Sequence, residues 1–119
     1  MLNEESQYNL KNVKINDVKS NGKALLYFIN NDITITNCEM ENINCNGDIN
    51  YSSLILYDSM ESNKKISLNN VIIKNVNSNG PMIKIDGDLS EFSLENAKIT
   101  ENVSYGPIFE NISKKVLLL

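Results

Sequence analysis

Four charged residues of this chain have the side-chain types that acid–base chemistry needs. They are Asp58, Lys84, Asp86 and Glu110, and the repeat pattern described below aligns them on one sheet. A lysine beside carboxylates can act as a general base. The chain has no histidine and no arginine, so it lacks the usual proton shuttle and the usual bidentate partner for a substrate carboxylate. We therefore expect these residues to form a solvated polar face, and we predict that the protein is not an enzyme.

Few residues could bind a metal or form a disulfide. Asp86-Gly87-Asp88 offers the oxygen ligands that calcium prefers, but one short turn does not supply the six or more oxygens required. Two cysteines without a histidine do not make a zinc site, and a cysteine nucleophile would have no base to activate it. We predict no metal and no cofactor. Cys38 and Cys45 could form one disulfide or remain reduced in a core.

The charge and the hydrophobic pattern exclude two classes of partner. The net charge is −4 and no arginine is present, so no basic stripe could follow a phosphate backbone, and we do not expect nucleic acid to bind. No stretch approaches the roughly 18 consecutive apolar residues of a membrane helix. The first residues are acidic, where a secretory signal would be basic and then apolar. If the parent protein is secreted, we expect this sequence to be one piece of it.

One short phrase recurs four times along the chain. Each copy starts at an asparagine and reaches a glycine after the same interval, at Asn12 to Gly22, Asn37 to Gly47, Asn70 to Gly80 and Asn96 to Gly106. Before each asparagine, apolar residues alternate with mostly polar ones, which is the period of a strand with one buried face. After each glycine comes a further apolar run. Each copy therefore holds about three short strands and spans roughly 25 residues, with a longer insertion in the second copy.

This repeat predicts an all-β fold, a right-handed parallel β-helix (solenoid) of about four to five coils with three short strands per coil. Residues 1–119 should form a single domain, expected to be a segment of a longer repeat array. In stacked coils, equivalent residues of successive copies lie next to one another. The four asparagines should therefore share one tight bend in the left-handed conformation, and the four glycines should share a second corner. Three inward columns follow: Ile33, Ile35, Ile66, Leu68, Phe92 and Leu94; Ile15, Met40, Ile73 and Ile99; and Leu26, Ile55, Ile83 and Phe109.

The segment Ile33 to Ile43, followed by Asn46-Gly47 and the apolar run 53–57, resembles the right-handed parallel β-helices called pectin-lyase-like. The Asn-rich coil with Ser-Asn-Gly-Pro-Met-Ile-Lys-Ile at 78–85 is similar to repeats of very large scaffoldin and adhesin-like proteins of anaerobic gut fungi. That resemblance implies an extracellular, cohesin-like role in which the module holds plant-cell-wall-degrading enzymes of a cellulosome through their dockerins. It implies no individual binding residues.

The strand after each glycine suggests where a partner would bind. Its outward positions should form an apolar column of Leu25, Leu54, Met82 and Ile108, beside a second column of Tyr27, Leu56, Lys84 and Glu110. Exposed apolar area on a rigid sheet is typical of a partner site. Charged residues around it fix the position of the partner. A shift of one residue in the strand phase would bury the apolar column instead. The predicted partner-binding residues are Leu25, Tyr27, Leu54, Leu56, Asp58, Met82, Lys84, Asp86 and Ile108.

We therefore expect a non-catalytic extracellular scaffold module that binds a small protein domain of the dockerin type on this face. An adhesin or cell-surface stalk repeat, acting as a spacer or a glycan-binding module, is the alternative. Uncapped strand edges would also permit end-to-end self-association. The sequons at Asn50, Asn102 and Asn111 would be glycosylation acceptors in a secreted eukaryotic protein.

Overall fold

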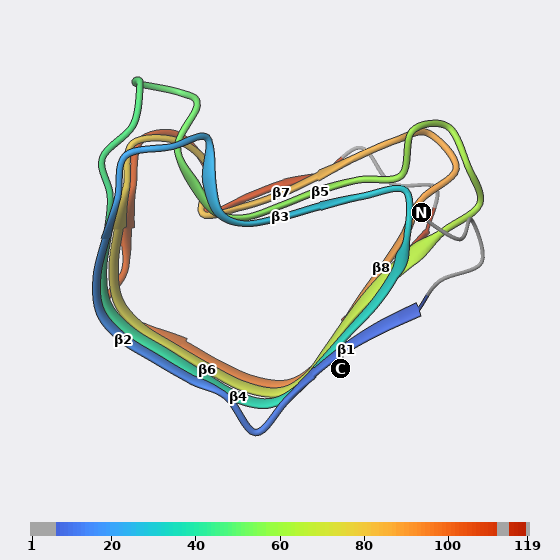
Figure 1. Ribbon diagram of the computed structural model, residues 1–119, viewed down its shortest axis with the longest axis horizontal. Helices are drawn as coiled ribbons and strands as arrows, with labels where there is room; N and C mark the ends of the chain where they lie inside the picture. Colours follow the sequence, from blue (N-terminus) through green and yellow to red (C-terminus); the bar gives the residue numbers. More distant parts are fainter. Residues whose placement is uncertain (1–6, 112–114, 119) are drawn as a thin grey trace.

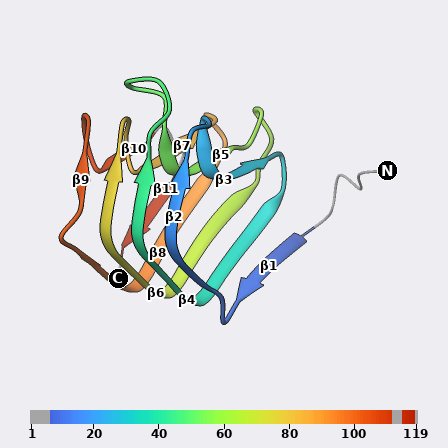
Figure 2. The same cartoon turned by 60° about the vertical axis from the view of Figure 1, so that its left-hand side comes forward.

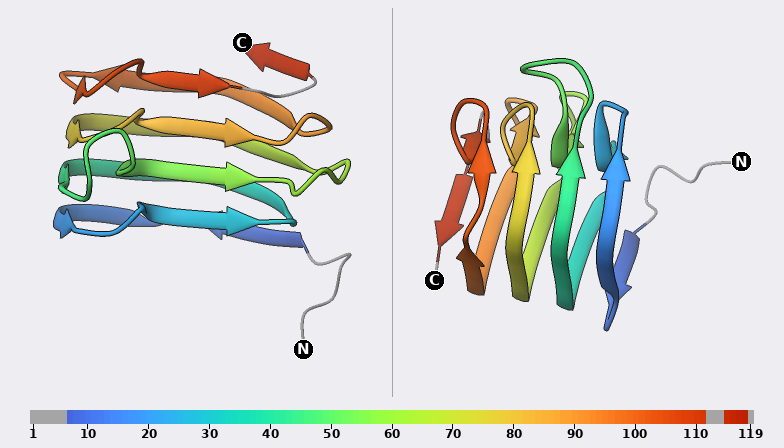
Figure 3. Two further views of the ribbon diagram at one scale, coloured as in Figure 1. Left: turned by 90° about the horizontal axis from the view of Figure 1, so that it is seen from above. Right: turned by 90° about the vertical axis from the view of Figure 1, so that its left-hand side faces the viewer.

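The computed structural model describes residues 7–111 and the backbone of 115–118, and shows a parallel β-solenoid of about four turns. Figure 1 views the coils end on, and Figure 3 shows them stacked side by side. Every strand pair in the described residues is parallel. The predicted all-β solenoid is confirmed. The strands are β1 (Gln7–Lys11), β2 (Lys14–Ser20), β3 (Ala24–Ile29), β4 (Asp32–Cys45), β5 (Ser53–Asp58), β6 (Lys65–Ser78), β7 (Ile83–Asp86), β8 (Glu91–Thr100), β9 (Val103–Ser104), β10 (Phe109–Asn111) and β11 (Lys115–Leu118).

The strands form two sheets. One has the order β1-β4-β6-β8-β11, with β2 paired to β4 and β9 paired to β6, and the other has the order β10-β7-β5-β3. The long strands β4, β6 and β8 run through two of the three predicted walls, and their pairing is interrupted only at the single residues where the chain bends, such as Asn37 and Asn70. Figure 2 shows these strands curving across the front of the molecule. No helix long and apolar enough to cross a membrane occurs in the described part of the chain.

The predicted asparagine bend is confirmed. Asn12, Asn37, Asn70 and Asn96 all have left-handed backbones with φ between 54° and 59°. The Asn96 Nδ2 donates to the Asn70 Oδ1 at 3.1 Å, and the Asn70 amide donates in the same way to Asn37. Asparagine suits this position because its short amide tolerates φ above zero and can bond to the equivalent side chain of the next coil.

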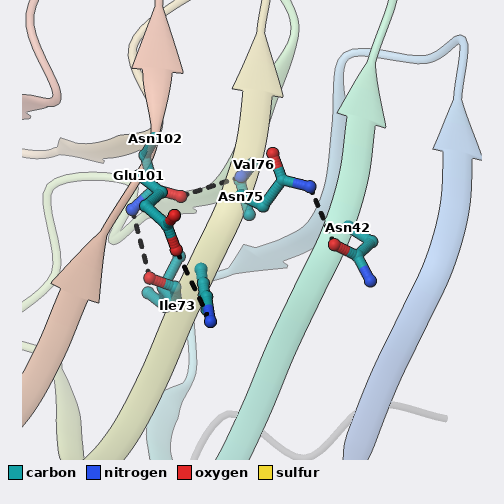
Figure 4. Close-up of polar contacts among 7 residues, drawn as sticks. Asn42, Ile73, Asn75, Val76, Glu101 and Asn102 are labelled. Atoms are coloured by element: carbon teal, nitrogen blue, oxygen red, sulfur yellow. Dashed lines mark hydrogen bonds and ion pairs between the residues drawn. The ribbon is translucent and has the colours of Figure 1, made fainter.

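A second left-handed corner, which the repeat pattern did not reveal, lies five residues further along each coil. Its residues are Asp17, Asn42, Asn75 and Glu101, with φ between 55° and 58°. The Asn75 Nδ2 donates to the Asn42 Oδ1 at 2.8 Å (Figure 4). This corner could not be predicted from the repeat because only two of its four residues are asparagine.

In the fourth coil, a side chain replaces backbone pairing at this second corner. The Asn102 Oδ1 accepts from the Val76 N–H at 2.8 Å, and its Nδ2 donates to the Ile73 carbonyl at 3.1 Å (Figure 4). Beside it, Lys74 forms an ion pair with Glu101 at 3.5 Å. Asn102 thus satisfies two main-chain groups of β6 that the adjacent strand does not reach.

The inward columns predicted from the sequence form the core of the central coils. The side chains of Ile35, Met40, Leu68, Ile73 and Ile83 are fully buried. Exposure increases toward the last described coil, where Phe109 is 37% exposed although its column was predicted to face inward. Burial is therefore governed by the number of neighbouring coils as well as by the direction of the side chain.

Two further sequence expectations are resolved. Cys38 and Cys45 are both free and buried, so they form no disulfide in the structure, and burial raises the pKa of the Cys45 thiol to about 11.

At the glycine corner, Gly47 and Gly80 pack so closely on the adjacent coil that a side chain would overlap it, and Gly106 has a left-handed φ of 94°. Gly22 has neither constraint, so the prediction fails there.

The left-handed bend makes Asn70→Ala destabilising. An alanine loses both amide contacts and must hold a backbone conformation that costs an L-residue about 1–2 kcal/mol, so the free energy of unfolding should fall by about that amount. Asn70→Gly also loses the amide contacts but tolerates the backbone, so it should lose less. Urea denaturation followed by circular dichroism measures both, and an equal loss in the two variants would show that the side-chain ladder, not the backbone, dominates.

Candidate functional site

The outer face of the β3-β5-β7-β10 sheet brings most of the predicted site residues together. Register pairing aligns Tyr27 with Leu56, Leu56 with Lys84, and Lys84 with Glu110. A second column beside it aligns Ile29 with Asp58 and Asp58 with Asp86. We refer to these seven residues as the outer face. It is apolar at the first coil and charged at the third and fourth coils.

The predicted outward column of Leu25, Leu54, Met82 and Ile108 is wrong. Leu54 and Met82 are fully buried members of the hydrophobic core, and Leu25 and Ile108 are half-buried and pack against it. These four residues therefore stabilise the solenoid, and the fully buried Leu54 and Met82 are not available to a partner.

An irregularity at the start of the strand explains the error. The ladder pairs Ala24 with Ser53 and then Leu26 with Ile55, omitting the step at Leu54. The Met82 carbonyl accepts from the N–H groups of both Leu54 and Ile55, at 2.9 and 3.0 Å. Two successive side chains can thus face the interior, as at a β-bulge, where strict alternation fails.

The backbone that carries the outer face lies inward of adjacent turns. In Figure 1, β5 and β7 lie inward of the turns that precede and follow them, whereas β3 lies inward only of the turn that precedes it. Leu56 is only 4% exposed, yet it lies outside the core cluster that contains its neighbours Ile55 and Tyr57. Leu56 is therefore an outward residue that its surroundings cover.

The charges on this face are partly shielded from water. Lys84 and Glu110 form an ion pair at 3.3 Å, with the lysine side chain 26% exposed. The lysines of the other two ion pairs, Lys14–Glu39 and Lys74–Glu101, are 80% and 51% exposed. Shielding from solvent strengthens electrostatic interactions. Among the lysines of these three ion pairs, Lys84 should therefore have the strongest interaction with its glutamate.

Asp86 lies in this charged environment. Burial is the main cause that raises the pKa of its carboxyl above the ordinary value, and the negative charges of Asp58 and Glu110 add to it. The positive charges of Lys84 and Lys23 act in the opposite direction. Asp58 is itself held in place because its Oδ1 accepts from the Met60 N–H at 2.9 Å.

Lys23 belongs to the site but was not predicted from the sequence. Its ammonium group lies 5.3 Å from the centroid of the Tyr27 ring, a cation–π contact. It also lines a hollow of about 300 Å³ together with Asn21, Gly22, Asp48 and Tyr51. Nothing in the spacing of the sequence indicated this, because Asp48 and Tyr51 belong to the insertion of the second copy.

The four residues considered for acid–base chemistry do lie close together. Asp58, Lys84, Asp86 and Glu110 share the outer face, as the alignment predicted. In the Asp86-Gly87-Asp88 turn, the Gly87 carbonyl accepts from both the backbone N–H and the hydroxyl of Ser90. Within residues 7–111, no three Asp, Glu or Cys side chains are arranged to hold a metal ion.

Comparisons with known proteins supply no relative: no protein-family model, curated protein or solved structure matches the chain.

The burial of Leu54 leads to a test of the corrected strand phase. Leu54→Ala should lower the free energy of unfolding by about 2–5 kcal/mol, because it removes a fully buried side chain and leaves a cavity. Leu89→Ala is the matched control, since Leu89 is 42% exposed in a turn and its truncation should cost less than about 1 kcal/mol. Chemical denaturation compares the two. If the Leu54 variant were as stable as the Leu89 variant, the Leu54 side chain would face outward, as the sequence predicted.

The environment of Asp86 predicts a pH-dependent effect of its neutralisation. A raised pKa means that the folded state favours the protonated carboxyl, so the native protein loses stability as pH rises through that pKa. Asp86→Asn removes this penalty and should be more stable than the native protein at pH 7, with the difference vanishing below the ordinary aspartate pKa of about 3.9. Thermal unfolding from pH 3 to 7 measures this. Asp88→Asn, on the exposed turn, controls for loss of one negative charge, and an Asp86→Asn variant less stable at pH 7 would contradict the prediction.

Proposed function

We propose that this chain is a non-catalytic scaffold module of an extracellular protein that binds a small protein domain of the dockerin type on its outer face. The observation that carries the proposal is the mixed character of this face, where the partly shielded ion pair of Lys84 and Glu110 is in register with the apolar Tyr27 and Leu56. The resemblance of the repeat to scaffoldin proteins supports the choice of partner.

The layout of the face suits a protein surface. Tyr27 and Ile29, each 43% exposed, provide apolar anchors at the first coil. Lys84 and Asp86 provide charges of both signs about two coils away. Apolar anchors contribute affinity, whereas charges of mixed sign fix orientation and exclude wrong partners. Because every coil pairs in register with the next, these groups are held at fixed spacing before a partner arrives, which lowers the entropy cost of binding.

A spacer repeat of an adhesin or stalk is the second candidate, and one observation favours it. The left-handed corners and their amide ladders continue through successive coils and provide rigidity without any partner. Glycan binding is less well supported, because Tyr27 is the single aromatic residue in the seven-residue face and its ring already contacts Lys23.

Charge reversal at Lys84 tests the proposal. In calorimetric titration of the full chain with an isolated dockerin module from a fungal plant-cell-wall hydrolase, we expect saturable binding that Lys84→Glu weakens about tenfold or more, equivalent to about 1.4 kcal/mol. Lys74→Glu is the matched control, because Lys74 also pairs with a glutamate of the following coil but lies on another wall. That variant should bind as the native chain does.

Two outcomes would count against the proposal. Equal weakening by both variants would mean that the outer face has no special role. Absence of saturable binding to the native chain would favour the spacer.

A further inference from the structure

Three N-x-Ser sequons occur in the chain, at Asn50, Asn102 and Asn111. Such a motif is an acceptor for an N-linked oligosaccharide when it lies on the surface of a secreted protein. The structure describes the first two sequons fully. For Asn111, the second and third sequon residues lie outside the described part of the chain.

The amide of Asn102 is already part of the fold. Its two polar atoms bond to the main chain at Val76 and Ile73, as described above, and its side chain closes the last described corner of that wall (Figure 4). A sugar would replace one of the two Nδ2 hydrogens, and it would have to fit beside a half-buried amide whose oxygen and nitrogen are both held against β6. A glycan at Asn102 would therefore crowd this corner and disturb the contacts that close it.

Asn50 has the opposite environment. It lies on the insertion between β4 and β5, which projects beyond the stacked coils in Figures 1 and 3. Asn50 is exposed, and its side chain forms no hydrogen bond with the described residues. Its backbone is fixed, because its N–H donates to the Asn79 carbonyl and Tyr51 closes a turn onto Asp48 at 2.9 Å. A glycan here would extend into solvent from a defined position.

The residues on either side of Asn50 are unusually apolar for a projecting loop. Ile49 is 57% exposed and Tyr51 is 61% exposed. Exposed apolar side chains of this size are a liability in a soluble protein unless something covers them. The apolar face of the first sugar, attached between them, would shield part of both side chains.

The serine of this sequon shows when the modification must take place. The Ser52 Oγ is buried, donates to the Gly22 carbonyl at 3.0 Å and accepts from the Gly47 N–H at 2.9 Å. A transferase could not reach this hydroxyl in the folded chain. Transfer therefore precedes folding, and the fold then selects which glycosylated chains it can accommodate.

From these observations we infer that Asn50 carries an N-linked oligosaccharide and that Asn102 does not. In the reaction, the Asn50 Nδ2 forms a bond to the anomeric carbon of an oligosaccharide carried on a lipid pyrophosphate. The bond from that carbon to the phosphate oxygen breaks, the lipid pyrophosphate leaves with the electron pair, and one amide proton is lost to a base of the transferase. This inference rests on the extracellular location proposed above, but not on the dockerin partner.

Site-resolved mass spectrometry of the full chain secreted from yeast tests the inference. Enzymatic deglycosylation in ¹⁸O-labelled water marks each formerly occupied asparagine by its mass. We expect the label at Asn50 in most secreted molecules and none at Asn102. Secreted, folded protein without a glycan at Asn50, or with one at Asn102, would overturn the inference.

Two variants make the test independent of folding and of partner binding. Asn50→Asp should lose the glycan while keeping the melting temperature of the unglycosylated native chain produced in bacteria, because aspartate also tolerates the left-handed backbone of residue 50 (φ 75°). Asn102→Gln should lower the melting temperature without changing the glycan at Asn50. If the Asn102 variant also lost the glycan at Asn50, occupancy at Asn50 would depend on the stability of the fold and not on the local sequon. That result would count against the inference.

Discussion

The whole structure depends on two left-handed bends that every coil must make at the same place. A left-handed backbone costs an ordinary L-residue about 1–2 kcal/mol, and the cost recurs with each coil. Asparagine reduces it, and its amide can bond to the next coil, as Asn70 does to Asn37 and Asn96 to Asn70. These bends set the direction of each wall, and hence which side chains face inward. A slip of one residue would exchange core and surface along an entire wall.

In-register stacking also creates the outer face. Because the coils repeat, single residues from separate copies become neighbours: Tyr27, Leu56, Lys84 and Glu110 come from four coils but form one column. The column is not uniform, since its character changes from aromatic to charged along the solenoid. The copies have thus diverged at outward positions while keeping the asparagine of the first bend and the inward positions alike, as expected when the fold constrains the inside and leaves the outside free to bind.

The sequence predicted most of the fold but only part of the site. The Asn-to-Gly interval and the alternation around Ile33 and Ile66 predicted the solenoid and two of its walls, because stacking requires equivalent residues to be alike. The error at Leu54 and Met82 arose where a bulge-like irregularity interrupts the alternation of inward and outward side chains. No residue type in the sequence marks this irregularity. Lys23 could not be foreseen either, since its contact with Tyr27 depends on how the turn after Gly22 folds back.

We propose that a partner binds on the outer face of the β3-β5-β7-β10 sheet. Nuclear magnetic resonance of the ¹⁵N-labelled chain, recorded with and without an unlabelled dockerin module, tests it most directly. We expect the backbone amide signals of Tyr27, Leu56 and Lys84 to shift most, while those of Glu39 and Ile72 on the neighbouring wall stay in place. The largest shifts at Glu39 and Ile72, or no shifts at any concentration, would contradict it.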